Sequence, residues 1–304
     1  MFAPTSSTRP VPAHRAAGHL HVLLAACLWG TTGTVRTFVP AASNLSIAAI
    51  RITVGGAVLL ATRRPAGSLR SSPLLLLVLG AAAIITYQTA FFVAADRTGV
   101  AIGTVVTIGS APAVAGVLGA VRERAWPSGR FVLATAGAVA GCAVLAGGGE
   151  SAGADPTGIG LAVLSGSAYA VYTTVVSALL GRGHDGRTVT AALFGLAALV
   201  MAPTLLTGSA GWVLTARGLP IAVYLGGAAT AGGYLLLARG LRTTPPATAT
   251  TLTLLEPAVA ALLGWALLHE HLGPSGLTGL ALIAASLALL VTGGSPRSSR
   301  RTRR

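Results

Sequence analysis

Ten apolar stretches, separated by short polar breaks, follow one another along nearly the whole chain. A transmembrane helix needs about 20 mostly apolar residues, and only helices and closed barrels satisfy their backbone groups inside lipid. Charged residues make up only 9% of the sequence and hydrophobic residues 53%, so most of the chain cannot face water. We therefore predict an all-α polytopic membrane protein with ten transmembrane helices, at residues 20–38, 45–61, 73–94, 100–121, 131–147, 159–180, 188–206, 219–238, 246–268 and 277–293.

One tetrapeptide occurs twice within these stretches. Pro112–Ala115 and Pro257–Ala260 both read Pro-Ala-Val-Ala, and Arg97–Thr98 returns as Arg242–Thr243 at the same offset of 145 residues. Self-similarity at about half the chain length indicates two copies of one unit, with five helices each. Because five is an odd number of crossings, the second copy must enter the membrane from the opposite side. The sequence therefore predicts two inverted five-helix repeats, an architecture typical of secondary transporters.

The arginines predict the orientation. If the N-terminus is cytoplasmic, 17 of the 21 basic residues fall in cytoplasmic segments, three lie on the opposite side, and Arg51 lies inside a helix. Such a bias is typical of cytoplasmic loops, so we expect a multi-pass protein of the cell (inner) membrane with both termini cytoplasmic. The net charge of +14 does not indicate nucleic-acid binding, because the arginines form short clusters without a basic helix face.

The chain is thus expected to consist of five parts. They are a disordered cytoplasmic tail (1–19), a first repeat (20–147), an extracytoplasmic linker (148–157), a second repeat (158–293) and a basic cytoplasmic tail (294–304). Cys27 follows Leu-Ala-Ala, as in a lipoprotein cleavage box, but the apolar stretch before it is short and is interrupted by His19 and His21. We therefore expect the first helix to be retained.

The predicted spans and their ends carry further recognisable residues, which are Trp29–Gly30, Ala49–Arg51, Pro112, Glu123–Arg124, Leu255–Pro257, Gly264–Trp265 and Glu270. Together and in this order, they make the chain resemble an EamA-type member of the drug/metabolite transporter superfamily. The resemblance extends from Leu20 to Val291. It implies a polytopic secondary carrier, often an exporter of amino acids, metabolites or toxic compounds.

Charge at membrane depth is the strongest local indication of mechanism, because a charged side chain there normally faces a cavity or a partner. Glu256 lies near the middle of the stretch 246–268, and we predict that it couples protons or contacts a cationic group of the substrate. The alternative is a structural acid beside Pro257. Arg51 is expected to bind a substrate carboxylate or to pair with Glu256. The alternative is an arginine that extends its charged end to the membrane surface or bonds carbonyls at its helix end.

Pro112 and Pro257 occupy matching positions, and each removes one helical hydrogen bond. We predict that they kink their helices and act as hinges, although packing alone also explains them. Glu123 and Glu270 end equivalent helices on opposite sides of the membrane in the predicted topology. The copies differ just before the repeated tetrapeptide, where the first copy has Ala111 and the second copy has Glu256 at the equivalent position. We expect the coupling site at this difference between the copies.

The remaining pathway candidates are Trp29, Tyr87, Gln88, Tyr172 and Tyr234, which lie within predicted spans. Each of the tyrosines is equally well explained as a packing or interfacial residue. The histidines at 269 and 271 point to different faces of a helix, so we expect no metal site, and the two cysteines lie in apolar segments. No cofactor is expected.

These features predict a secondary transporter that works by alternating access, with a small-molecule substrate, the lipid bilayer as its surroundings and protons as a candidate coupling ion. A homodimer is one of the assemblies that the sequence allows. A lipid-carrier flippase of related architecture is the alternative. An intramembrane enzyme is disfavoured because it would need clustered nucleophiles, paired carboxylates or histidine–acid sets at membrane depth, and a channel because no ring of repeated charges occurs.

Overall fold

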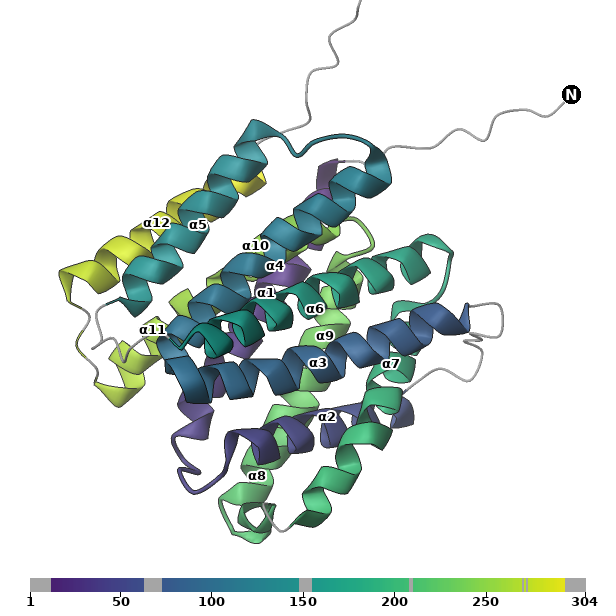
Figure 1. Ribbon diagram of the computed structural model, residues 1–304, viewed down its shortest axis with the longest axis vertical. Helices are drawn as coiled ribbons and strands as arrows, with labels where there is room; N and C mark the ends of the chain where they lie inside the picture. The colour runs from purple at the N-terminus through teal and green to yellow at the C-terminus, as the bar shows by residue number, and fades with distance from the viewer. Residues whose placement is uncertain are drawn as a thin grey trace, which may run out of the picture.

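The computed structural model describes residues 12–62, 73–147, 155–207, 210–269, 271 and 273–292. All regular elements in these ranges are helical (Figure 1). The first half holds α1 (Pro12–Arg36), α2 (Asn44–Ala61), α3 (Leu74–Thr98), α4 (Val100–Glu123) and α5 (Gly129–Ala146). The second half holds α6 (Pro156–Gly181), α7 (Gly186–Met201), η1 (Ala202–Thr207), η2 (Gly211–Leu214), α8 (Gly218–Val223), η3 (Tyr224–Gly232), α9 (Gly233–Gly240), α10 (Pro246–Leu252), α11 (Leu255–Leu268) and α12 (Pro274–Thr292).

Nine spans in the described ranges are long and apolar enough to cross a membrane. They correspond to the second to tenth predicted helices, with helix runs such as α10–α11 counted as one span. The expected first span is α1, which has 25 residues but includes His14, Arg15, His19 and His21 in its sequence. Its length suffices for a crossing at 1.5 Å per residue, so the structure holds nine apolar spans and a tenth, more polar helix.

The two halves contact each other in a reciprocal pattern. The first helix of the first half, α1, packs against α9 and α11 of the second half, and the first helix of the second half, α6, packs against α3 and α4. The second helices, α2 and α7, pack against each other, as do the last helices, α5 and α12, at one edge of the molecule (Figure 1). Such an exchange of equivalent contacts is what two copies of one unit related by a two-fold axis produce.

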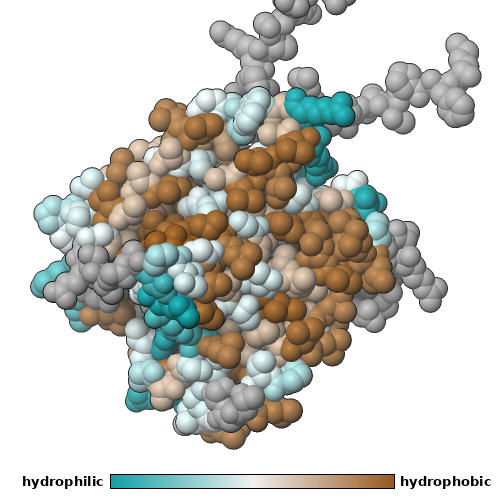
Figure 2. All heavy atoms as spheres, in the orientation of Figure 1, coloured by the Kyte–Doolittle hydropathy of each residue, from teal (hydrophilic) through white to brown (hydrophobic). Residues whose placement is uncertain are grey.

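Glycines set the closest of these contacts. A Cβ atom on Gly141 of α5 would lie 2.9 Å from the carbonyl oxygen of Gly279 in α12, and one on Gly279 would lie 2.7 Å from the carbonyl oxygen of Gly141. Only the lack of side chains lets these backbones approach so closely, which is the usual way that membrane helices pack. Large apolar side chains face outward instead and cover much of the visible surface (Figure 2). Exposed examples are Leu74, Leu75, Val121, Leu133 and Leu199.

Two predicted spans are interrupted rather than continuous. The stretch expected at 219–238 has a π-helical centre, η3, between α8 and α9. The stretch expected at 246–268 breaks between α10 and α11, at Thr253 and Leu254. π-helical turns and broken helices are frequent at functional sites, and both interruptions lie close to the candidate site described below.

The N-terminal boundary differs from the prediction. Helix α1 begins at Pro12, so residues 12–19, expected in the disordered tail, are helical. Proline is favoured in the first turn because its missing N–H needs no partner there, a signal that the polar composition obscured. Helix α6 begins at Pro156, capped by Asp155. Most of the expected linker (148–154), residues 1–11, the C-terminal tail and Glu270 lie outside the described residues.

Candidate functional site

A small cavity lies between the two halves, and Glu256 is one of its walls. Its volume is about 20 Å³, which is enough for roughly one water molecule and far below the ~300–1,000 Å³ of typical ligand pockets. The described structure is therefore closed around this point. The cavity is lined by Trp29, Tyr87, Thr107, Ile108, Ala111, Tyr169, Thr253 and Glu256.

Matching positions of the two halves meet in this cavity. Ile108 and Thr253 are separated by the same 145 residues as Ala111 and Glu256, and all four line it. Ile108 and Thr253 each precede a repeated proline by four residues, so their carbonyl groups are the ones that lose a helical N–H partner. The position predicted from broken symmetry, Ala111 against Glu256, thus lies where the halves face each other.

An aromatic cluster surrounds the cavity. Trp29 packs against Tyr234 with 4.9 Å between ring centroids, and Tyr87 against Tyr169 with 5.3 Å. Tyr172 contacts Tyr234 at 5.6 Å and joins the cluster without lining the cavity. Four of the five tyrosines of the chain therefore converge on one place, drawn from α3, α6 and α9. This convergence goes beyond what the scattered sequence positions indicated.

Polar groups within the cluster keep unused hydrogen-bonding capacity. The hydroxyl of Tyr172 and the side-chain nitrogen of Gln88 are buried without a hydrogen-bond partner among the described residues. Such groups are costly to leave unsatisfied, and buried polar groups without a partner in a protein call for an explanation such as water or a ligand. Gln88 itself does not line the cavity, although it follows Tyr87, which does.

Trp29 and Gly30 hold α1 against both interrupted spans. The indole Nε1 of Trp29 donates a hydrogen bond of 2.9 Å to the carbonyl oxygen of Ala229 in the π-helix η3. Gly30 faces the other interruption, because a Cβ atom there would lie only 2.8 Å from the carbonyl oxygen of Glu256 and 2.7 Å from Cβ of Val259. The Trp-Gly pair therefore positions the backbone that carries the acid.

Arg51 also reaches the π-helix. Its Nε donates to the hydroxyl of Thr230 at 3.4 Å, and that hydroxyl in turn donates to the carbonyl oxygen of Leu225 at 2.7 Å, five residues earlier. None of the ion pairs among the described residues joins Arg51 to Glu256. Arg51 instead lies at the end of the hydrogen-bonded chain through Thr230.

The two repeated prolines, at each of which we predicted a kink, lie in different local structures. Pro112 lies within the continuous helix α4. Pro257 follows the break between α10 and α11, where the carbonyl oxygen of Thr253 accepts a 2.9 Å hydrogen bond from the backbone N–H of Glu256 instead of from the proline. In the same break, the thiol of Cys142 donates a hydrogen bond of 3.9 Å to the carbonyl oxygen of Leu254. Only the second copy has an interrupted helix at this level.

The helix ends refine the relation between the two glutamates. Helix α4 ends at Glu123 and is capped by Arg124, whereas α11 ends at Leu268 and is capped by His269. Both capping residues are left-handed, with φ of 51° and 56°, and they too are 145 residues apart. The caps, rather than the glutamates, are therefore the equivalent positions. Glu270 comes after its cap in the sequence and lies outside the described residues.

A wider groove adjoins the cavity on the side where α4 ends. It has a volume of about 260 Å³. On α4, Ala115 of the groove lies one helical turn after Ala111 of the cavity. On α6, Thr174 of the groove lies five residues after Tyr169 of the cavity. We call it the Glu123 groove; it is lined mainly by Ala115, Gly116, Gly119, Glu123, Trp126, Phe131, Thr174, Pro245, Pro246 and Thr248.

Several residues of the site could not be singled out from the sequence. Thr107, Ile108 and Thr253 carry no charge and no motif, yet they line the cavity, and Thr230 holds Arg51. For Ile108 and Thr253 a usable signal existed, since each stands four residues before a repeated proline. For Thr230 the sequence contains no such signal, because the residues of an apolar stretch do not indicate a π-helical turn.

The cavity thus lies between two packed halves of the chain. The profile of the EamA-like transporter family matches residues 16–147 and again residues 156–292. The chain belongs to the EamA-like transporter family. Each match covers one of the two halves of this EamA-family protein, so the resemblance noted in its sequence is confirmed. It is a membrane-integral transporter, and membership of a transporter family favours a function other than catalysis.

Two comparisons extend this result. The EamA-family chain is 37% identical over 284 residues to the "Uncharacterized transporter YwfM" of Bacillus subtilis (strain 168), and the alignment covers 92% of this chain and 95% of that protein. It also resembles a solved crystal structure with a TM-score of 0.78 at 20% identity, covering 90% of this chain and 96% of the other. The first similarity is to a transporter, and the second concerns the fold alone.

Proposed function

We propose that this EamA-family protein is a secondary carrier that exports small metabolites, amino acids or toxic compounds by alternating access. The observation that carries the proposal is the cavity at Glu256. It combines an acid at membrane depth, a broken helix and matching positions of both repeats. Binding sites of secondary transporters typically lie at such an interface, near broken helices at the bilayer midplane.

The Glu123 groove gives this proposal a direction of access. The groove and the cavity follow the same face of α4, through Ala111, Ala115 and Gly119, so a substrate in the groove would advance about one helical turn along α4 to reach the cavity. Under the arginine distribution, the groove is on the cytoplasmic side, as are both termini. We infer that the closed cavity opens toward the groove in one state and toward the opposite side in the other. The break before Pro257 supplies a place where α10 and α11 can change their relative angle.

The chemistry of the cavity favours substrates that carry a positively charged or protonatable nitrogen. Glu256 supplies a negative charge, and the faces of Trp29, Tyr87 and Tyr169 supply aromatic surfaces that attract cations within about 6 Å. The same carboxylate is suited to exchange a proton with the substrate during the cycle. In the state without bound substrate, the positive charge of Arg51, which is held by Thr230, balances the negative charge of Glu256.

The test is a transport assay with a variant that fills the cavity. Extracellular metabolites and compound tolerance of cells with and without the protein identify a substrate, and uptake of that substrate is then measured in proteoliposomes. Ala111, which is 2% exposed and lines the cavity, is replaced by leucine. Ala113→Leu is the matched control, because Ala113 lies on the same helix and is exposed.

We expect Ala111→Leu to abolish transport and Ala113→Leu to leave it near the wild-type rate, with both variants folded by their unfolding transitions. If Ala111→Leu folds and transports normally, the route does not pass through this cavity, and the proposal is refuted. Equal loss in both variants despite folded protein would likewise contradict it.

A further inference from the structure

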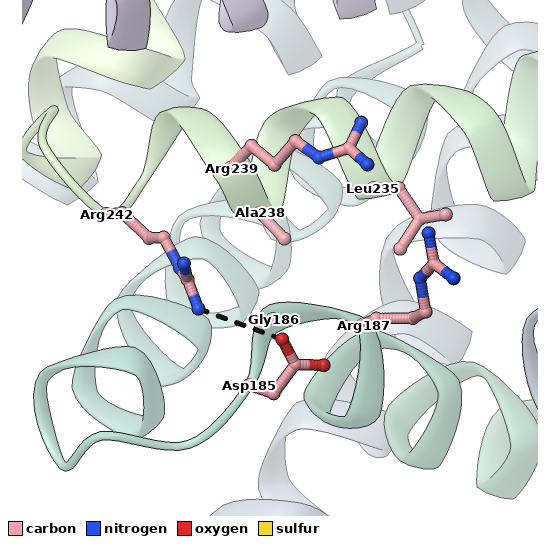
Figure 3. A pocket seen from close by; sticks show the side chains of 7 residues that line it. All are labelled: Asp185, Gly186, Arg187, Leu235, Ala238, Arg239 and Arg242. Atoms are coloured by element: carbon pink, nitrogen blue, oxygen red, sulfur yellow. Dashed lines mark ion pairs between the residues drawn. The ribbon is translucent and has the colours of Figure 1, made fainter. Parts of the chain in front are cut away.

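A second cavity lies away from Glu256, between the start of α7 and the end of α9 (Figure 3). Its volume is about 190 Å³. Three arginines, Arg187, Arg239 and Arg242, and one acid, Asp185, stand around it. The proposed transport route makes no use of this cavity.

Asp185, the single acid among the residues that line this cavity, caps the N-terminus of α7. One carboxylate oxygen of Asp185 accepts hydrogen bonds from the backbone N–H and the hydroxyl of Thr188, at 3.1 and 3.3 Å, which caps α7. The other oxygen lies 3.8 Å from Arg242. Partial burial alone would raise the pKa of Asp185, but the hydrogen bonds from Thr188 and the charge of Arg242 outweigh it and hold the pKa below its usual value. At neutral pH the cavity therefore carries three positive charges against one negative charge.

The other two guanidinium groups have capacity to spare. Arg187 is half-buried and donates to the carbonyl oxygen of Thr62 at a long 3.4 Å. Arg239 makes neither a side-chain hydrogen bond nor an ion pair among the described residues. In Figure 3 the side chains of Arg187 and Arg239 extend toward the same end of the cavity, on either side of Leu235. The exposed side chain of Arg239 and the remaining donors of Arg187 are therefore available to a ligand in a cavity whose wall also contains Leu235 and Ala238.

We propose that this cavity binds a phosphate group, most simply the phosphodiester of an anionic lipid. Arg187 is the second residue of the spanning segment Gly186–Leu206, and Arg239 is the next-to-last residue of Gly218–Gly240. Both therefore lie at the membrane–water boundary, where lipid phosphates are found. Guanidinium groups bind phosphate oxygens in pairs of parallel hydrogen bonds, and the volume equals that of roughly six water molecules, which is room for a headgroup rather than for one small ion.

A general excess of arginine beside membrane spans does not account for this arrangement. The positive-inside bias requires arginines in loops, but it does not require them to surround a common cavity. Arg182 provides the comparison, because it is exposed in the same α6–α7 connection and does not line the cavity. The site is independent of the proposed transport route, so it stands even if that route is wrong.

The experiment measures lipid binding to the purified full-length protein by native mass spectrometry, with phosphatidylglycerol as the probe and phosphatidylcholine as the neutral reference. Arg239→Gln should weaken phosphatidylglycerol binding about ten-fold, since it removes the charge-assisted hydrogen bonds of one guanidinium group to the bound phosphate. Arg182→Gln should leave it unchanged. Asp185→Asn, which keeps a good helix cap, should strengthen it.

A second arm adds inorganic phosphate, with chloride at equal ionic strength as the control. If phosphate displaces phosphatidylglycerol in the wild type and chloride does not, the cavity recognises the phosphate itself and accepts soluble phosphate too. If only the lipid binds, the ligand is the headgroup in the membrane. Equal effects of Arg239→Gln and Arg182→Gln, or binding of phosphatidylglycerol no tighter than of phosphatidylcholine, would overturn the proposal.

Discussion

Gly30→Ala tests whether the close contact between α1 and the Glu256 turn holds the site in place. The added Cβ atom would lie 2.7 Å from Cβ of Val259 and 2.8 Å from the carbonyl oxygen of Glu256, whereas ordinary contacts begin near 3.4 Å. The helices must then separate by about 0.7 Å to relieve the shorter contact, and overpacking of this kind costs about 1–3 kcal/mol. Alanine regains about 0.5–1 kcal/mol of helix stability relative to glycine.

Gly33→Ala is the matched control, because Gly33 lies one turn further along α1 and no atom of the described residues lies within 4 Å of its added Cβ. It gains the same helix stability without the clash, so the difference between the two variants isolates the overpacking. We expect Gly30→Ala to be less stable than Gly33→Ala by about 1–3 kcal/mol, as measured by equilibrium unfolding in mixed detergent micelles, and to transport more slowly. Equal stability and equal transport in the two variants would refute the role of this contact.

Three further changes have defined outcomes. Trp29→Phe leaves a buried carbonyl of η3 without its donor and should lower the free energy of unfolding by about 1–3 kcal/mol; an unchanged unfolding midpoint would count against the bond. Gly141→Val should separate α5 from α12 and lower thermal stability, whereas Gly129→Ala, which meets no atom within 4 Å, should not. The hydrogen bond from Arg97 is the largest cause that lowers the pKa of Asp155, so its stabilising effect is present above the ordinary carboxyl pKa and is lost as the pH falls through the lowered one. Thermal unfolding from pH 5 to 3 should therefore depend less on pH in Asp155→Asn than in the wild type.

The broad fold could be predicted because lipid leaves the backbone few options. The third predicted helix, 73–94, is observed as α3, Leu74–Thr98, and the fifth, 131–147, as α5, Gly129–Ala146. Ends such as these follow from capping, since Ser128 accepts a hydrogen bond from the backbone of Phe131. The duplication was readable because the repeated tetrapeptide survived in both copies.

Departures from regular helix geometry were not predictable in the same way. The π-helical turn around Thr230 arises where Gly226 and Gly55 allow η3 and α2 to pack closely, which is a tertiary effect. Pro257 signalled a disturbance, but Pro112 carries the same signal within a continuous helix. At the break the freed backbone has a partner from another helix, because the thiol of Cys142 contacts the carbonyl of Leu254, and the sequence around Pro257 does not indicate that partner.

The candidate site was predicted in part. Glu256, Trp29 and Tyr87 line one cavity, whereas Arg51 lies beside it and Tyr172 and Tyr234 support its walls. Charge at membrane depth identifies the acid because an isolated carboxylate is costly there. Neutral wall residues have no such cost, and only the packing of the two halves selects them.

The most direct test of the central claim is proton-driven transport by Glu256→Gln in proteoliposomes with an imposed pH gradient. Asp96→Asn serves as the control, because Asp96 is an exposed acid near the end of α3 and lines neither the groove nor the cavity. We predict that the pH gradient accelerates transport by the wild type and by Asp96→Asn and has no effect on Glu256→Gln. A Glu256→Gln protein that responds to the gradient as the wild type does would contradict the account.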